Sequence, residues 1–301
     1  MPRKENDLFE RQKSGSVLCP SCGQLVGVND EQCLHCGRKN PGMWGYGAFV
    51  RALGRDFGFF KLVIFGCAGL YIASLALDPK GMQSGGLRFF APSWRALFLL
   101  GGSGYQAVFE LGRWWTVLSA GWLHGDLLHI GFNMYWVRIL APATAEFYGV
   151  GRTVIIYTVA CVAGFVFSSV ANAFVPLIPV LGGILGALGL GGAYRTIGAS
   201  GAIFGLLGAI VYYGRRTGHQ SVYRQSIGYV VIFAIFAIVV PYVDNQAHLG
   251  GFVGGYFAGK ILDPQRPERG DHLFLAVVCL ALSALSVAVS FWTGLKFFPA
   301  S

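Results

Sequence analysis

From residue 59 onward the chain is dominated by long apolar stretches separated by short polar segments. A helix needs about 20 residues to cross the hydrocarbon core of a membrane. Seven stretches reach or approach that length: 59–77, 126–148, 153–176, 198–214, 226–243, 247–262 and 272–295. A hydrophobic content of 54%, a charged content of 12% and a mean hydropathy of +0.55 exclude an ordinary soluble domain. The sequence therefore predicts an all-α polytopic membrane protein with seven spans.

The basic residues carry information about topology. The chain has a formal net charge of +9, but its Lys and Arg residues lie mostly at the N-terminus and in alternate segments between the apolar stretches. That distribution is typical of cytoplasmic loops, so it gives no support to a nucleic-acid partner. The polar segment 1–55 also lacks the pattern of a signal peptide. We expect a protein of the plasma membrane or bacterial inner membrane, surrounded by lipid, with a cytosolic N-terminus.

One glycine-rich stretch, 177–197, is apolar enough to be an eighth span. If it crossed the membrane, the basic residues Arg215, Arg216 and Arg224 would move to the outer side, against the positive-inside bias. We therefore interpret 177–197 as a loop.

Four of the seven cysteines lie in the N-terminal segment as two Cys-x-x-Cys pairs, Cys19/Cys22 and Cys33/Cys36. Four thiolates at this spacing suit a tetrahedral zinc ion, and a module this small needs such a cross-link. Disulfides are disfavoured in a reducing cytosol, and His35 is a weaker alternative ligand. The sequence predicts a zinc-ribbon-like module at 1–40, with a structural zinc ion and a cytosolic partner for the ribbon, followed by a linker at 41–56.

Polar side chains inside the predicted spans indicate a functional site, because they are costly in lipid. His129 and Asn133, four residues apart, share one face of the second span, just after His124. Ser200 opens the fourth span and His248 opens the sixth. Since the second, fourth and sixth spans run in the same direction, all these residues are expected at one membrane level.

Small residues predict that the fourth and sixth spans touch. Glycines recur every three or four residues on each, and such seams let helix backbones approach closely. The members are Gly201, Gly205 and Gly208 on one span and Gly251, Gly255 and Gly259 on the other. Close approach would bring the Ser200 hydroxyl to the His248 imidazole, and an adjacent imidazole is what turns a serine into a nucleophile.

The motifs Gly198-Ala199-Ser200-Gly201, Ala247-His248-Leu249-Gly250-Gly251 and the His124/His129/Asn133 spacing resemble those of the rhomboid family of intramembrane serine proteases. The resemblance covers roughly 57–262. It implies a six-helix core with Ser200 as nucleophile, His248 as general base, Asn133 and His129 stabilising the oxyanion, and His124 in support. It also implies that catalysis needs no cofactor and that the substrates are transmembrane proteins cleaved near the outer surface. The last span, within 263–301, is an addition to that core.

Two details of the site stay open at this stage. Asp244, four residues before His248, is a weak candidate for orienting the imidazole. Phe204 stands where some family members have a tyrosine that packs on the histidine, which keeps the stacking surface and loses only a hydroxyl.

Two other functions compete with the protease. A catalytically silent rhomboid-like protein that binds membrane helices is opposed by the intact serine and histidine. A proton-relaying transporter is opposed by the scarcity of acidic residues within the spans.

Overall fold

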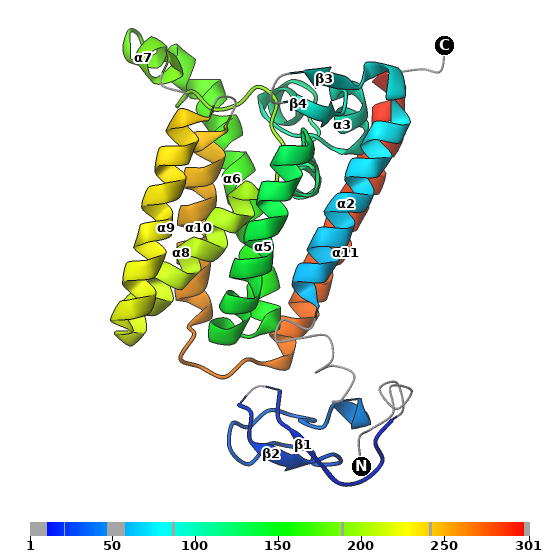
Figure 1. Ribbon diagram of the computed structural model, residues 1–301, viewed down its shortest axis with the longest axis vertical. Coiled ribbons are helices and arrows are strands. Elements are labelled where there is room, and N and C mark those ends of the chain that lie inside the picture. Colours follow the sequence, from blue (N-terminus) through cyan, green and yellow to red (C-terminus); the bar gives the residue numbers. More distant parts are fainter. Residues whose placement is uncertain are drawn as a thin grey trace.

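The computed structural model describes residues 11–20, 22–46, 58–85, 88–187, 190–240 and 243–297. The predicted linker 41–56 lies outside this range from residue 47 onward. Within the described residues, a small N-terminal module lies below one end of a bundle of long helices (Figure 1).

The bundle contains seven described helices of at least 18 residues, one at each predicted apolar stretch. They are α2 (Phe59–Leu77), α5 (Leu127–Tyr148), α6 (Val150–Phe174), α8 (Ser200–Thr217), α9 (Gln220–Val239), α10 (Asn245–Leu262) and α11 (Gly270–Gly294). In the described chain, three helical segments are long and apolar enough to cross a membrane by length and composition alone: 59–77, 150–177 and 270–297. Of the other four helices, α5, α8 and α10 carry the glycines and polar groups noted in the sequence.

Shorter elements connect α2 to α5 at the end of the bundle farthest from the N-terminal module (Figure 1). An antiparallel hairpin, β3 (Gln83–Gly85) and β4 (Arg88–Ala91), is followed by α3 (Trp94–Leu100), a π-helical turn at Gln106–Glu110 and α4 (Thr116–Ser119). At the same end, the described part of the glycine-rich stretch contains the short helix α7 (Leu181–Ala187) and is otherwise mostly irregular, with an isolated bridge from Thr196 to Ser103.

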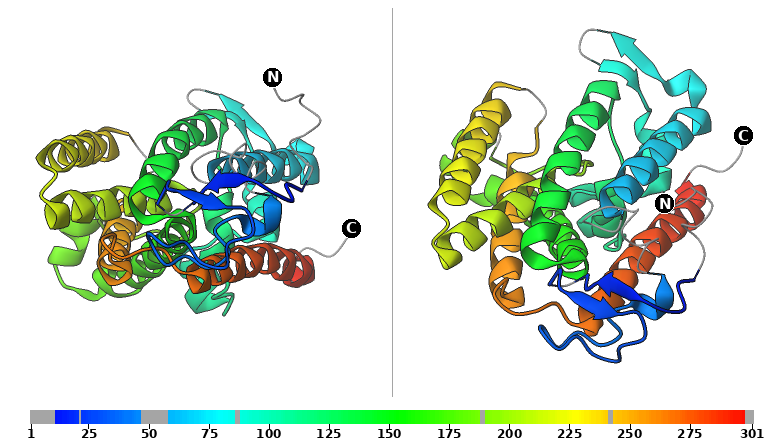
Figure 2. Two further views of the ribbon diagram at one scale, coloured as in Figure 1. Left: turned by 90° about the horizontal axis from the view of Figure 1, so that it is seen from below. Right: turned by 60° about the horizontal axis from the view of Figure 1, so that its bottom comes forward.

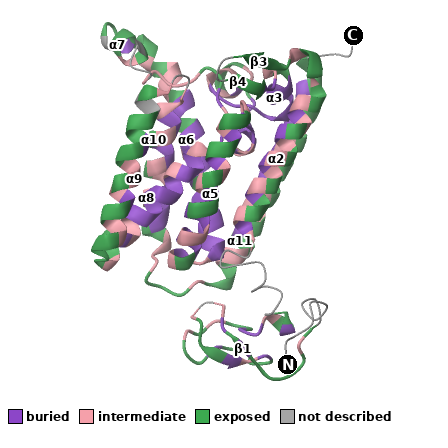
Figure 3. Cartoon of the chain, in the orientation of Figure 1, coloured by how far each residue is buried: buried purple, intermediate pink, exposed green. Residues whose placement is uncertain are grey.

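The distribution of buried residues shows which helices lie in the middle of the bundle. Buried residues concentrate on α6 and α8, whereas α2, α9 and α11 keep broad exposed apolar faces (Figure 3). A soluble protein would bury such faces, so their exposure agrees with lipid contact. Views from below and from an inclined angle show α8 and α10 on the opposite side of the bundle from α2 (Figure 2).

The last helix, α11, is fastened to the rest of the bundle near both ends. At one end, the buried Arg113 guanidinium donates to the Ser290 carbonyl at 2.8 Å, and Trp115 Nε1 donates to Ser290 Oγ at 3.1 Å. At the other end, the guanidinium of buried Arg152 on α6 donates to carbonyls of Asp263 and Arg266 in the connection from α10 to α11. All three guanidinium nitrogens of Arg152 donate hydrogen bonds, and a buried cation paired in this way holds its neighbours firmly.

The N-terminal module has a hairpin of β1 (Ser16–Leu18) and β2 (Leu25–Gly27) and a small core of three valines and the cysteines. The module extends beyond its predicted boundary at residue 40, because the Gln12 N–H donates a hydrogen bond to the Gly45 carbonyl. Arg38 of the module acts electrostatically on Glu268, which accepts a hydrogen bond from the Arg152 backbone N–H at 3.1 Å. Burial raises the pKa of the Glu268 carboxyl, and these partners oppose that rise.

Candidate functional site

The Ser200 hydroxyl and the His248 imidazole meet between α8 and α10. Ser200 Oγ lies 2.8 Å from His248 Nε2, which is hydrogen-bond distance. The Phe204 ring, one helical turn after the serine, stacks on the imidazole with centroids 4.2 Å apart and planes 14° apart. The two side chains expected to meet from the sequence therefore do so, and Phe204 fixes the plane of the ring.

The glycine seams explain how the two helices come so close. A Cβ added to Gly251 would overlap the Gly201 carbonyl, and one added to Gly255 would overlap the backbone of Gly205. A side chain at either α10 position would push the helices apart. The predicted contact between the fourth and sixth spans is thus a backbone-to-backbone contact, and it sets the distance between the serine and the histidine.

The chain enters α8 in a conformation that only glycine adopts easily. Gly198 has φ of +128°, and its N–H donates to the Ala120 carbonyl at 2.9 Å. A Cβ at Gly198 would lie 2.8 Å from His129 Nε2 and 3.8 Å from Ser200 Oγ. Gly198 therefore leaves open the space between the serine and His129.

The start of α10 is fixed by Asp244, though not in the way considered from the sequence. Its carboxylate accepts from the Ala247 N–H at 3.0 Å as a helix N-cap, and from the Ser168 hydroxyl at 2.7–2.8 Å. His248 Nδ1 is buried and has no hydrogen-bond partner among the described residues. Asp244 thus holds the helix that carries the histidine and does not contact the imidazole by a hydrogen bond.

Ser168, on α6, is a residue that sequence reasoning missed. It is fully buried, and besides donating to Asp244 it accepts from the Ala193 N–H at 3.0 Å. A second bond between the same two segments runs from the Gln246 side chain to the Leu190 carbonyl. The segment leading into α8 and the start of α10 are therefore tied together through α6. The rule that polar groups inside a span are informative would have identified Ser168, had it been applied to the third span.

The predicted oxyanion residues and His124 have different surroundings. Asn133 is 1% exposed, and its amide donates to the His129 carbonyl at 2.8 Å, while its Oδ1 has no partner in the described chain. His129 Nδ1 accepts from the Gly125 N–H at 3.3 Å. His124 is fully buried and lies edge-on to His129, with ring centroids 5.1 Å apart. No hydrogen bond joins these three to Ser200 or His248 within the described residues.

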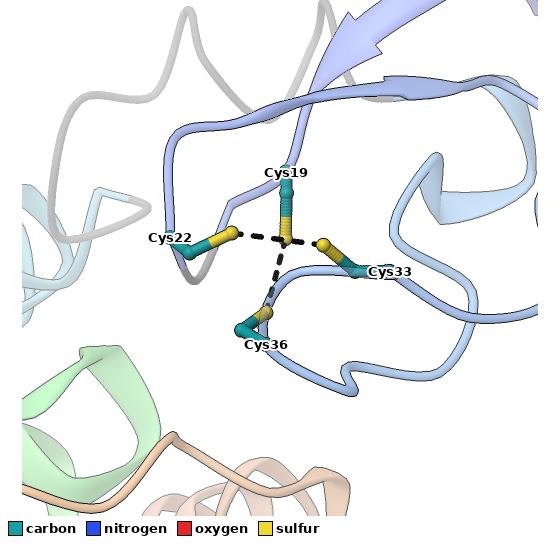
Figure 4. A group of neighbouring side chains, drawn as sticks. All are labelled: Cys19, Cys22, Cys33 and Cys36. Carbon is teal, nitrogen blue, oxygen red and sulfur yellow. Dashed lines mark hydrogen bonds between the residues drawn. The ribbon is translucent and has the colours of Figure 1, made fainter.

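The four cysteines of the module converge, as Figure 4 shows. Their sulfur atoms all lie within 4.8 Å of one another, with Cys19 Sγ 3.7 Å from Cys36 Sγ and Cys22 Sγ 3.6 Å from Cys33 Sγ. These distances are much longer than a disulfide bond. His35 is exposed and does not belong to the group.

The cluster fits a zinc ion in three respects. Zinc–sulfur bonds of about 2.3 Å in a tetrahedron place the sulfurs about 3.8 Å apart, close to the observed separations. Each Cys-x-x-Cys pair forms the same turn, in which the glycine after the second cysteine donates its N–H to the carbonyl of the first. Burial raises the pKa of the Cys36 thiol to about 12, whereas hydrogen bonds from the backbone, of Cys36 first, lower the pKa of the Cys33 thiol to about 7; a bound cation favours the thiolate form of both.

Comparison with known proteins agrees with the site. The family model described as Rhomboid domain matches residues 111–265, which include all five predicted active-site residues. The chain is 31% identical over 188 residues to rhomboid protease GluP of Bacillus subtilis (strain 168), covering 60% of this chain and 33% of that protein. It is 30% identical over 192 residues to RHOMBOID-like protein 6, mitochondrial, of Arabidopsis thaliana, covering 62% and 55%.

The same family contains proteins named as inactive. The chain is 27% identical over 168 residues to Inactive RHOMBOID-like protein 8 of Arabidopsis thaliana, covering 54% of this chain and 42% of that protein. This chain spans between a third and just over half of the length of these three relatives. The match covers half of the chain and includes its serine and histidine motifs, so this integral membrane protein belongs to the rhomboid family.

Proposed function

We propose that the protein is an intramembrane serine endopeptidase that cleaves transmembrane proteins with a Ser200–His248 dyad. The observation that carries the proposal is the 2.8 Å contact between Ser200 Oγ and His248 Nε2 inside a membrane bundle. A serine hydroxyl becomes a useful nucleophile when a base can take its proton at this distance. The inactive relative makes catalytic silence the alternative, and the intact dyad argues against it.

The dyad can carry out both halves of peptide hydrolysis. Ser200 Oγ attacks the scissile carbonyl carbon while His248 Nε2 takes the hydroxyl proton. When the C–N bond breaks, His248 gives that proton to the departing amine, which leaves an ester on Ser200. Water then attacks the ester with His248 as base, releasing the new carboxyl group and restoring the serine.

The negative oxygen of each tetrahedral intermediate needs hydrogen-bond donors. The Ser200 backbone N–H lies in the first turn of α8, where N–H groups lack partners in the helix. The Asn133 amide carries two hydrogens and donates one to its own helix, so a second is available. His129, whose Nε2 borders the space at Gly198, is the third donor we assign, and His124 supports His129 through ring contact.

The proposed substrates enter from the side of the membrane away from the N-terminal module. Helices α5, α8 and α10 begin at that end (Figure 1), and the positive-inside bias makes it the outer side of a plasma or bacterial inner membrane. A substrate helix rich in glycine or other poor helix formers would unwind there most easily. The module would then hold its structural zinc in the cytosol, where it is available to a cytosolic partner.

Active-site labelling tests the proposal. Full-length protein in detergent should react with a fluorophosphonate probe and cleave a reconstituted transmembrane substrate, and Ser200→Ala should abolish both. His248→Ala should abolish cleavage, whereas Ser169→Ala, which removes a buried hydroxyl bonded only within α6, should retain it. Wild-type protein that folds but neither labels nor cleaves would support the silent alternative, and cleavage by Ser200→Ala would refute the mechanism.

A further inference from the structure

A basic hollow lies where α8 and α10 end, at the end of the bundle nearest the N-terminal module (Figure 1). Its volume is about 430 Å³, and five residues line it: Tyr212, Arg215, Arg216, Tyr256 and Lys260. Three of the five are cations, and none of the five is acidic. This site is distant from the dyad along the same two helices, because Ser200 and His248 lie in their first turns.

The three cations are free to bind a ligand. Arg215, Arg216 and Lys260 are all exposed, and none forms an ion pair with an acidic residue in the described chain. The neighbouring acid after α10, Asp263, is paired instead with Arg266 at 3.2 Å. Arg215 and Arg216 lie in the last turn of α8, where the negative end of the helix dipole favours cations. That interaction is with the helix backbone and does not supply a counter-ion. A concentrated positive charge without a counter-ion favours an anion.

The walls of the hollow suit the boundary between lipid and water. The rings of Tyr212 and Tyr256 meet edge-to-face with centroids 5.3 Å apart, and tyrosine is the kind of side chain found at headgroup level. Next to Tyr256 and Lys260, an exposed apolar stripe runs along α10 through Val253, Phe257 and Ile261, which are 42%, 52% and 81% exposed. An acyl chain could lie on this stripe while its headgroup occupies the hollow.

We propose that this hollow binds the phosphate headgroup of an anionic phospholipid in the leaflet that faces the N-terminal module. Basic pockets between transmembrane helices on the cytoplasmic side are a known way of recognising such headgroups. Arg215, Arg216 and Lys260 surround the phosphate, and the tyrosine hydroxyls supply neutral donors. The occupant is a lipid and not free phosphate, because the apolar stripe continues directly from the cationic hollow toward the membrane interior.

The experiment uses full-length protein in a neutral detergent. Midpoint temperatures of unfolding are measured during titration with short-chain phosphatidylglycerol, with the matching phosphatidylcholine, and with inorganic phosphate. Phosphatidylglycerol should raise the midpoint saturably, and the other two should not. An equal rise with inorganic phosphate would overturn the lipid assignment, and so would an equal rise with phosphatidylcholine.

Two triple variants with the same change in charge locate the binding. R215Q/R216Q/K260Q should weaken the apparent affinity for phosphatidylglycerol about a hundredfold, because each cation near an anionic lipid contributes about a fivefold gain. K13Q/K39Q/R224Q, which alters exposed cations outside the hollow and leaves the Asp263–Arg266 pair intact, should bind as wild type does. Unchanged affinity in the first variant, or equal loss in both, would refute the site. Fluorophosphonate labelling monitors folding and is not expected to change.

Discussion

At the scale of single residues, two side-chain contacts set the position of the His248 imidazole. The His248 ring has Ser200 on one nitrogen and Phe204 stacked on its face, while its other nitrogen has no partner in the described chain. Stacking on Phe204 therefore orients the imidazole, a role that a third hydrogen-bonding residue has in a catalytic triad. Phe204 achieves this without a hydroxyl, which confirms that the stacking surface expected from the sequence is retained.

Asn133 allows a residue-scale test of the proposed oxyanion site. Asn133→Ala should lower kcat about a hundred- to a thousandfold with little change in KM, because one preorganised donor to the transition state is lost. Thr144→Ala is a matched control on the same helix, since its buried hydroxyl bonds only to the Leu140 carbonyl. A purely structural role for Asn133 would instead show as a large fall in the unfolding midpoint with kcat preserved in the folded fraction.

At the scale of elements, the proposed active site lies where the first turns of two helices, α8 and α10, meet. Gly198 shapes the entry to α8, and Asp244 caps α10. Ser168 of α6 connects the two, because its hydroxyl contacts both Asp244 and the Ala193 N–H. The distance between Ser200 and His248 therefore depends on how α6, α8 and α10 are joined at one end, as well as on the glycine seam between α8 and α10.

Removing the Ser168 hydroxyl should loosen this connection. In Ser168→Ala the N–H of the half-buried Ala193 loses its acceptor and Asp244 loses a donor, at a cost of about 1–3 kcal/mol in the free energy of unfolding. We expect a lower unfolding midpoint and slower fluorophosphonate labelling, because the two helix starts become less well held. Ser169→Ala, the neighbouring control, should change neither by as much. Equal effects of the two substitutions would show that Ser168 has no special positioning role.

At the scale of the whole molecule, the module and the bundle depend on different forces. The bundle is held by helix packing and by the Arg113 and Arg152 contacts that fasten α11. The module has only a minimal apolar core around its cysteines. Metal binding can supply about 10–16 kcal/mol to a module of this kind, so its folding should depend on zinc.

Replacing two of the four cysteines proposed as zinc ligands should separate the behaviour of the module from that of the bundle. Cys19→Ser/Cys22→Ser should release about one zinc ion per chain and unfold the module, because two thiolates cannot close the tetrahedral site. Labelling of Ser200 in detergent should persist. Elemental analysis measures the metal, with His35→Ala and Cys279→Ser as controls that should retain it. Wild-type protein without bound zinc would contradict the assignment, and loss of labelling in the double variant would show that the module supports the active site.

Orientation in the membrane can be tested on intact cells with an impermeant thiol reagent. A cysteine introduced at Lys296, after α11, should be labelled from outside, whereas Ser221→Cys in the first turn of α9 should be labelled only after permeabilisation. The unmodified chain gives the background from its own cysteines. Labelling at position 221 in intact cells would mean that the stretch 177–197 crosses the membrane and would reverse the proposed topology.

Much of this protein could be predicted from its sequence alone. The positions of the long helices follow from hydropathy, because lipid requires long apolar runs and allows few exceptions. The four-cysteine cluster follows from spacing, since short Cys-x-x-Cys turns present their thiols locally. The pairing of Ser200 with His248 follows from their two sequence motifs and from the equal membrane depth expected for them. The glycine seams already indicated that the fourth and sixth spans touch.

Other features required the tertiary structure, because they depend on contacts between residues far apart in the chain. Nothing local shows that Asp244 bonds to Ser168, 76 positions away, or that Arg152 reaches the connection more than 110 positions later. The basic hollow likewise exists only because the ends of α8 and α10 lie side by side. Hydropathy and spacing determine which elements form, whereas the positioning network, the attachment of α11 and the hollow arise only when helix packing brings distant polar groups together.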